Sequence, residues 1–149
     1  MLERSYHHNG GSLIEIYQNC NIFNDGAFDE YTSADKFDNV IEVKHGEPMV
    51  FAKGKKGIKL DGFKAVVVDM ENHSMDDLLV HDETNLDLAH IIANWTTHPV
   101  LPEPIGVIYS VDEPTYNSEM VSQVESAVKV KGAGKVQDLL NAGDTWTVK

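Results

Sequence analysis

The sequence predicts an α/β fold. If the chain is a fragment of a larger domain, its elements by themselves would be classed as α+β. Three features lead to this prediction. The chain begins with a short helical segment, a glycine turn and a β-prone run. Its middle part alternates short β-prone runs with turn residues, and a longer helical pattern follows near the C-terminus.

The N-terminal stretch predicts a helix over residues 1–8 that ends at Asn9-Gly10-Gly11, where a left-handed cap residue fits. Residues 12–18, SLIEIYQ, predict a strand because β-branched and aromatic residues dominate there. A helix, a glycine turn and a strand make half of a βαβ unit whose first strand is absent. We therefore expect a fragment of a larger α/β domain; a short, weakly packed N-terminal helix is the alternative.

Turn residues divide the central part of the chain. Residues 29–39 are polar and predict a loop. Turn signals such as His45-Gly46-Glu47-Pro48 and Asp61-Gly62 then separate β-prone runs. The runs predict a meander of four short strands near residues 40–44, 49–53, 57–60 and 63–69. The basic segment KGKKGIK, Lys53–Lys59, is expected to be a solvated hairpin tip rather than a phosphate or partner contact.

The second half of the chain mixes both kinds of element. Residues 76–82 predict a strand, and residues 85–95 predict a helix whose apolar face is Leu88, Ile91, Ile92 and Trp95. A proline-containing segment leads into a strand predicted over residues 105–111. A helix over residues 117–131 and a short amphipathic turn over residues 135–140 complete the pattern.

The helix predicted over residues 117–131 has signals at both ends. Asn117 can cap its N-terminus, and Gly132 ends it. Val121, Val124 and Val128 form a stripe that we expect in the core.

The composition indicates a cytoplasmic protein. The 149 residues and 16.6 kDa suit one ordinary domain, and no apolar run approaches the roughly 20 residues of a membrane span. The start MLERSYHHNGG lacks the apolar core of a secretory signal, and one cysteine allows no internal disulfide. The formal charge of −12 disfavours nucleic acid and anionic membranes as partners.

Motifs for metal, phosphate or acid–base chemistry are weak. His7 and His8 are adjacent, so they cannot chelate a metal as an i, i+4 pair could. His81 and Asp82 resemble an acid–base pair, but adjacent residues in a strand face opposite ways, which favours a polar cluster at a strand end. The segment GAGK, residues 132–135, lacks the spacing of a phosphate-binding loop and indicates a helix break.

Cys20 is the single thiol of the chain. A lone cysteine near a strand end is most often a small buried hydrophobe, whereas a nucleophile needs positive neighbours. The neighbours here are amides (Gln18, Asn19, Asn21 and Asn24), which can donate N–H bonds to sulfur and suit a metal-bound thiolate better. The residues alone leave both the buried and the ligand interpretation open.

The segment SLIEIYQNCNIFNDGAF, residues 12–28, closely resembles the late strand of the β subunit of 2-oxoacid:ferredoxin oxidoreductases, especially the 2-oxoglutarate type. The resemblance continues in order through HGEPMVF, DGFKAVVVD, LLVHD, PEPIGVIYSVDEPTYN and LLNAGDTWTV. It therefore covers nearly the whole chain, which resembles the C-terminal portion of that subunit.

The resemblance implies an enzyme that decarboxylates a 2-oxo acid on thiamine diphosphate, passes single electrons through a 4Fe–4S cluster to ferredoxin, and forms acyl-CoA. It further implies that Cys20 is a cluster ligand in the full-length subunit, because a cysteine at the end of a late strand is one of the family's ligands. The family's upstream cysteines and its Gly-Asp-Gly signature for Mg²⁺ and the diphosphate are missing. We therefore expect no catalytic or other cofactor-binding residue, no bound cofactor and no activity in this chain alone.

The same resemblance implies a domain organisation and partners. Residues 1–28 would be the end of the thiamine diphosphate-binding domain, and residues 29–149 the C-terminal domain of the β subunit. The expected partners are the α subunit, a second β subunit and, indirectly, ferredoxin; the strong acidity of the chain places ferredoxin docking elsewhere in the complex. A severed fragment would expose a sheet edge and could form a homodimer. The alternative is a stand-alone, non-catalytic assembly or interaction module derived from this region.

Overall fold

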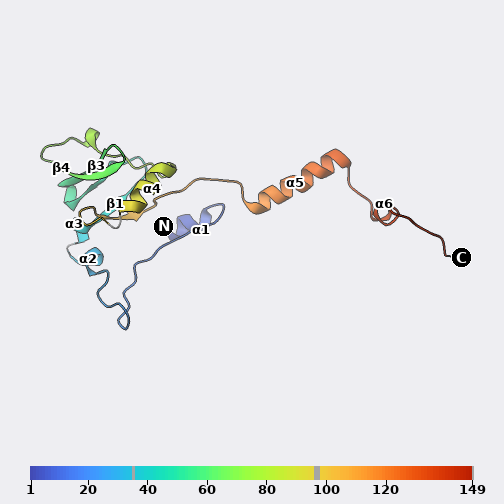
Figure 1. Cartoon of the computed structure of the whole chain (residues 1–149), viewed down its shortest axis with the longest axis horizontal. Helices are drawn as coiled ribbons and strands as arrows, with labels where there is room; N and C mark the ends of the chain where they lie inside the picture. Colours follow the sequence, from blue (N-terminus) through green and yellow to red (C-terminus); the bar gives the residue numbers. More distant parts are fainter. Residues whose placement is uncertain (35, 96–97, 149) are drawn as a thin grey trace. The chain divides into compact units, whose positions relative to one another are not determined.

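Two units make up the computed structural model, which describes residues 1–34, 36–95 and 98–148 (Figure 1). The first unit comprises Met1–His7 and Leu13–Val111, and the second comprises His8–Ser12 and Asp112–Lys149. Among the described residues, every buried hydrophobic side chain belongs to the first unit. The domain boundary after residue 28 that the resemblance implies stays a prediction.

The first unit is a mixture of short helices and strands. Its elements in chain order are α1 (Leu2–His7), α2 (Asp29–Thr32), α3 (Lys36–Asn39), β1 (Val40–Val43), β2 (Val50–Phe51), the 3-10 turn η1 (Ala52–Gly54), β3 (Lys56–Asp61), β4 (Lys64–Asp69), the 3-10 turn η2 (Met75–Asp77), α4 (Leu86–Trp95) and β5 (Glu103–Gly106).

Two small sheets organise these strands. β1 and β5 pair in parallel from Val40 opposite Glu103 to Val43 opposite Gly106, and β2, β3 and β4 form an antiparallel sheet in that order. A parallel pair with a helix between its strands, beside an antiparallel meander, confirms the α/β prediction. The four-strand meander is wrong in one respect, because β1 leaves it to pair with β5.

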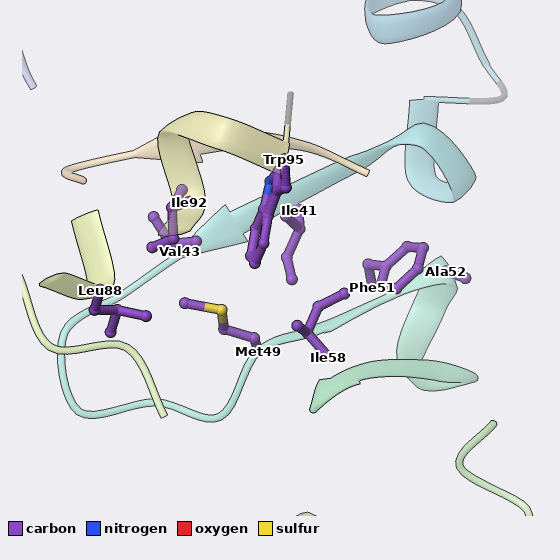
Figure 2. Packing of buried hydrophobic residues seen from close by; sticks show 9 residues of the cluster. All are labelled: Ile41, Val43, Met49, Phe51, Ala52, Ile58, Leu88, Ile92 and Trp95. Carbon is purple, nitrogen blue, oxygen red and sulfur yellow. The ribbon is translucent and has the colours of Figure 1, made fainter. Parts of the chain in front are cut away.

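The core lies between these sheets and α4. Figure 2 shows the apolar side chains of α4, Leu88, Ile92 and Trp95, facing those of the strands and the loop before β2. Ile41, Ile58 and Ile92 have no exposed surface. The helix predicted over residues 85–95 is confirmed, and the Asn85 side chain caps it by accepting the Leu88 N–H at 3.0 Å. Its fourth predicted core residue, Ile91, is half-buried.

The strand predicted over residues 12–18 is absent. Residues 11–19 have no regular secondary structure, and Leu13 and Ile16 are 98% and 69% exposed. A β-prone sequence forms a strand only where another strand offers its hydrogen-bonding edge, and within the described residues no strand pairs with this segment. Residues 1–8 do contain the predicted helix, as α1.

Three further predictions need correction. The polar segment 29–39 contains the single helical turns α2 and α3 rather than only loop. Residues 76–82 form no strand: Ser74 and Asp77 close a capping box around η2, and only Val80 bridges to Pro48. The strand predicted over residues 105–111 ends at Gly106, whose φ of 120° departs from strand geometry.

The second unit consists of α5 (Tyr116–Lys131), α6 (Val136–Leu140) and irregular segments. The cap of α5 is Thr115 rather than Asn117, because the Thr115 hydroxyl accepts the Ser118 N–H at 3.2 Å. Gly132 ends the helix with a φ of 78°, which confirms the predicted break in GAGK.

The valine stripe of α5 is not in a core. Val121, Val124 and Val128 are 56%, 58% and 47% exposed, and no described residue from Asp112 to Val148 is buried. A helical stripe identifies which face is apolar, but it does not show whether anything covers that face. No helix in the described part of the chain is long and apolar enough to cross a bilayer.

Candidate functional site

Cys20 lies in a tight turn of the loop that joins the irregular segment 11–19 to α2. The thiol-bearing residue is half-buried, and its carbonyl accepts the Asn24 N–H at 2.9 Å. This loop, Gln18–Ala27, is the blue segment before α2 in Figure 1. The sequence predicted a thiol at the end of a strand, whereas the structure places it at the start of a turn.

Backbone N–H groups of the turn act on the Cys20 thiol. Hydrogen bonds from the Phe23 N–H and then the Ile22 N–H lower the pKa of the Cys20 thiol, and the Asn24 N–H adds to them. Burial acts in the opposite direction. The turn therefore favours a thiolate, which is the form that binds metals.

The side-chain amides have a different role from the one the sequence predicted. Asn19 holds the loop together: its side chain donates to Asp25 at 2.8 Å and to Asn21 at 3.2 Å, and it accepts the Gly26 N–H at 2.9 Å. The donors to sulfur are backbone groups instead. The sequence could not indicate these donors, because every residue type except proline has a backbone N–H group.

Aromatic residues close the base of the loop, and sequence reasoning missed them. The rings of Tyr17 and Phe28 are stacked, with centroids 5.0 Å apart and planes 10° apart, and the Tyr31 ring lies 5.9 Å from Tyr17. The Tyr17 hydroxyl donates a hydrogen bond to the Glu103 carboxylate in β5. Burial and this hydrogen bond raise the pKa of Tyr17 above its ordinary range, so the hydroxyl remains a donor at neutral pH.

The donor set of the loop fits one ligand of an iron–sulfur cluster. A 4Fe–4S cluster takes four thiolates, and hydrogen bonds to sulfur are among the features that tune it. This chain offers one sulfur with N–H donors around it. In the described part of the chain no three His, Cys, Asp or Glu side chains gather as a metal site. The other thiolates would have to come from outside this sequence.

The side chains of His81 and Asp82 point to different partners, as expected for adjacent residues in an extended chain. His81 is 1% exposed and its Nε2 lies 2.8 Å from the Val107 carbonyl, whereas Asp82 accepts from Thr84 and lies 3.6 Å from His45. Asp82 thus belongs to a polar cluster with Thr84 and His45, and it does not form an acid–base pair with His81. The His81 Nδ1 is buried and has no hydrogen-bond partner among the described residues.

A pocket of about 220 Å³ lies beside this cluster, where Arg4 of α1 makes two hydrogen bonds to Glu83, one of them 2.9 Å long. The charges that line it are already partly paired within the chain. His7 and His8 contribute no shared site, since His8 lies 3.9 Å from Asp112 and His7 contacts Tyr6.

The basic segment Lys53–Lys59 lies at η1 and the start of β3. The ammonium group of Lys53 lies 5.3 Å from the centre of the Phe37 ring, and that of Lys56 lies 5.8 Å from the Phe51 ring. These cations therefore lie against aromatic rings of their own chain.

A comparison with known proteins bears on the expected class, the β subunits of 2-oxoacid oxidoreductases. Over 99% of its length the chain is 36% identical to a protein of Mycobacterium tuberculosis named 2-oxoglutarate oxidoreductase subunit KorB. This similarity confirms the resemblance seen in the sequence. The chain spans 41% of the length of that relative. No family model matches the chain, and no solved structure matches it significantly.

Proposed function

We propose that this chain is the C-terminal portion of the β subunit of a 2-oxoacid:ferredoxin oxidoreductase, of the 2-oxoglutarate type. The observation that carries the proposal is the 36% identity to KorB along 99% of the chain. The complete cytoplasmic enzyme would convert a 2-oxo acid and coenzyme A to acyl-CoA on thiamine diphosphate and Mg²⁺. Its partners would be an α subunit, a second β subunit and, indirectly, ferredoxin.

Cys20 is the residue of this chain that would hold a cofactor, as one of the four thiolates of a 4Fe–4S cluster. The cluster, when bound, accepts and passes on single electrons. The chain's own contribution is the turn at residues 20–24, which presents the Phe23 and Ile22 N–H groups to the sulfur and stabilises its negative charge. Since the other three thiolates and the diphosphate-binding signature are not in this sequence, the chain alone is inactive.

The substitution Cys20→Ser in the full-length subunit tests this function. We expect loss of cluster iron and sulfide, or a shifted reduction potential, because the hydroxyl is a poor substitute for a thiolate ligand. The matched control is Asn72→Ser, at an exposed residue outside the cysteine loop, which should keep the cluster. Unchanged cluster content and potential in Cys20→Ser would remove the proposed role. The purified 149-residue chain should show no 2-oxoacid-dependent reduction of ferredoxin in the same assay.

A further inference from the structure

The loop that carries Cys20 has few attachments to the rest of the first unit. The hydrogen bonds found for residues 19–26 among the described residues stay within residues 19–29. Ile22 and Phe23 are 83% and 89% exposed, so their side chains do not pack on the core. Among the described residues, the loop is therefore connected to the rest of the first unit through its two ends.

Tyr17 and Phe28 close the base of the loop. They flank the loop in sequence, and their stacked rings bring its two ends together. Tyr17 also reaches out of the loop, because its hydroxyl donates to Glu103. Glu103 is the first residue of β5, which pairs with β1, a strand that contributes Ile41 and Val43 to the core. A continuous set of contacts thus runs from the core to the loop.

We propose that Tyr17 is a positioning residue for Cys20: its stacking on Phe28 and its hydrogen bond to Glu103 hold the turn that presents backbone N–H groups to the sulfur. The inference rests on the proposed function, since it assigns a purpose to the geometry of a cluster ligand. Tyr17 does not contact the sulfur in this scheme. It restricts the motion of the turn, so that the N–H groups of residues 22–24 keep their orientation.

The first test measures amide hydrogen exchange at residues 22–24 in this chain, which needs no cluster. Tyr17→Leu removes the stacking and the hydrogen bond, so we expect these amides to exchange roughly tenfold faster. Tyr17→Phe keeps the ring and loses the hydroxyl, so the increase should be smaller, roughly threefold. Glu103→Gln keeps an acceptor oxygen and should stay near the wild-type rate. Tyr6→Leu is the matched control, because Tyr6 is 84% exposed on α1, and it should change nothing in the loop.

The second test measures the reduction potential of the cluster in the full-length subunit. Fewer N–H bonds to sulfur leave its negative charge less stabilised, so Tyr17→Leu should shift the potential to a more negative value. Tyr17→Phe should shift it less, and Glu103→Gln should keep a potential near the wild-type value. A residue with a merely structural role would lower the cluster content without moving the potential of the clusters that remain. If Tyr17→Leu assembles no cluster, the potential of Tyr17→Phe decides the matter.

The two experiments separate the inference from the function on which it rests. Unchanged exchange in Tyr17→Leu, or an unchanged potential in Tyr17→Phe with accelerated exchange, would overturn the positioning role while leaving Cys20 a ligand. An unchanged cluster in Cys20→Ser would overturn the proposed function, whatever the exchange data show.

Discussion

Gly106 is a residue whose backbone no other residue type can easily reproduce. Its φ is 120°, and a Cβ atom built there would lie 2.5 Å from the Val43 carbonyl oxygen. The tight approach occurs where β5 ends against β1, and the next residue, Val107, provides the carbonyl next to His81. The end of the β1–β5 pair and the position of the carbonyl next to His81 therefore both depend on the absence of a side chain at residue 106.

The substitution Gly106→Ala should destabilise the first unit by about 1–3 kcal/mol, because the strained φ and the backbone clash must both be relieved by movement of β5. Urea denaturation followed by circular dichroism measures this change. Gly134→Ala is the control: a Cβ at Gly134 meets nothing within 4 Å, so its effect should stay within about 0.5 kcal/mol. Equal stabilities of the two variants would contradict the argument.

Cys20 shows how far prediction from the sequence reached at the scale of single residues. Its neighbours predicted amide donors near the sulfur, and only the resemblance of residues 12–28 indicated a ligand. The structure replaces the side-chain donors by the backbone of residues 22–24 and adds Tyr17 and Phe28. Local composition does not determine the conformation of a turn, and a stack between residues 11 positions apart leaves no periodic signal.

At the scale of elements, α1 depends on one charged pair. This helix has six residues and no buried side chain, so its own hydrogen bonds give it little stability. Arg4 anchors it through two hydrogen bonds to Glu83, whose side chain is only 13% exposed. The Arg4 guanidinium lowers the pKa of Glu83, and burial opposes the shift.

The sign of the resulting pH dependence follows from this direction. A lowered carboxyl pKa stabilises the folded state above the ordinary value near 4.5, and the contribution is lost as the pH falls through the lowered value. We expect Arg4→Ala to cost about 0.5–1 kcal/mol at pH 7, and less at pH 3, where protonation of Glu83 weakens the pair. Chemical denaturation at the two pH values tests this. The control Lys44→Gln removes an exposed pair with Glu42, at 3.4 Å, and should have little effect at either pH. An equal cost of Arg4→Ala at both pH values would rule out the ion pair as its cause.

The sequence predicted a helix or strand correctly where the same chain provides the core or the neighbouring strand that the element contacts. α4 has its apolar face, its cap and a core to cover, so the periodic pattern sufficed. The run at residues 12–18 has the composition of a strand but no partner within the described residues. The partner of β1 was also unpredictable, because its paired residues, such as Val40 and Glu103, are 63 positions apart and β5 contains a proline.

At the scale of the whole molecule, burial is distributed very unevenly. The buried hydrophobic side chains of the described residues lie between Ile41 and Trp95. From Asp112 to Val148 no described residue is buried, although Val124, Leu139 and Trp146 are apolar and 58%, 77% and 85% exposed. The hydrophobic contribution to the stability of this chain therefore comes from the first unit.

A chain that ends at Val111 should consequently be as stable as the 149-residue chain. We expect its free energy of unfolding in urea to stay within about 0.5 kcal/mol of the value for the 149-residue chain. The dependence of that free energy on urea should also change little, because it scales with the surface that unfolding exposes. Thermal and urea denaturation of both chains at several protein concentrations measure these quantities.

The concentration series makes the outcome interpretable. If deletion lowers the stability by several kcal/mol at every concentration, residues 112–149 stabilise the fold within one molecule, and the burial argument is wrong. If the 149-residue chain, but not the shortened one, becomes more stable as its concentration rises, the exposed apolar residues of the second unit pair between two copies. Association stabilises the folded state by mass action. Equal stabilities at all concentrations would mean that these residues contribute nothing to the folded chain by itself. Their apolar surface would then be available to another protein chain.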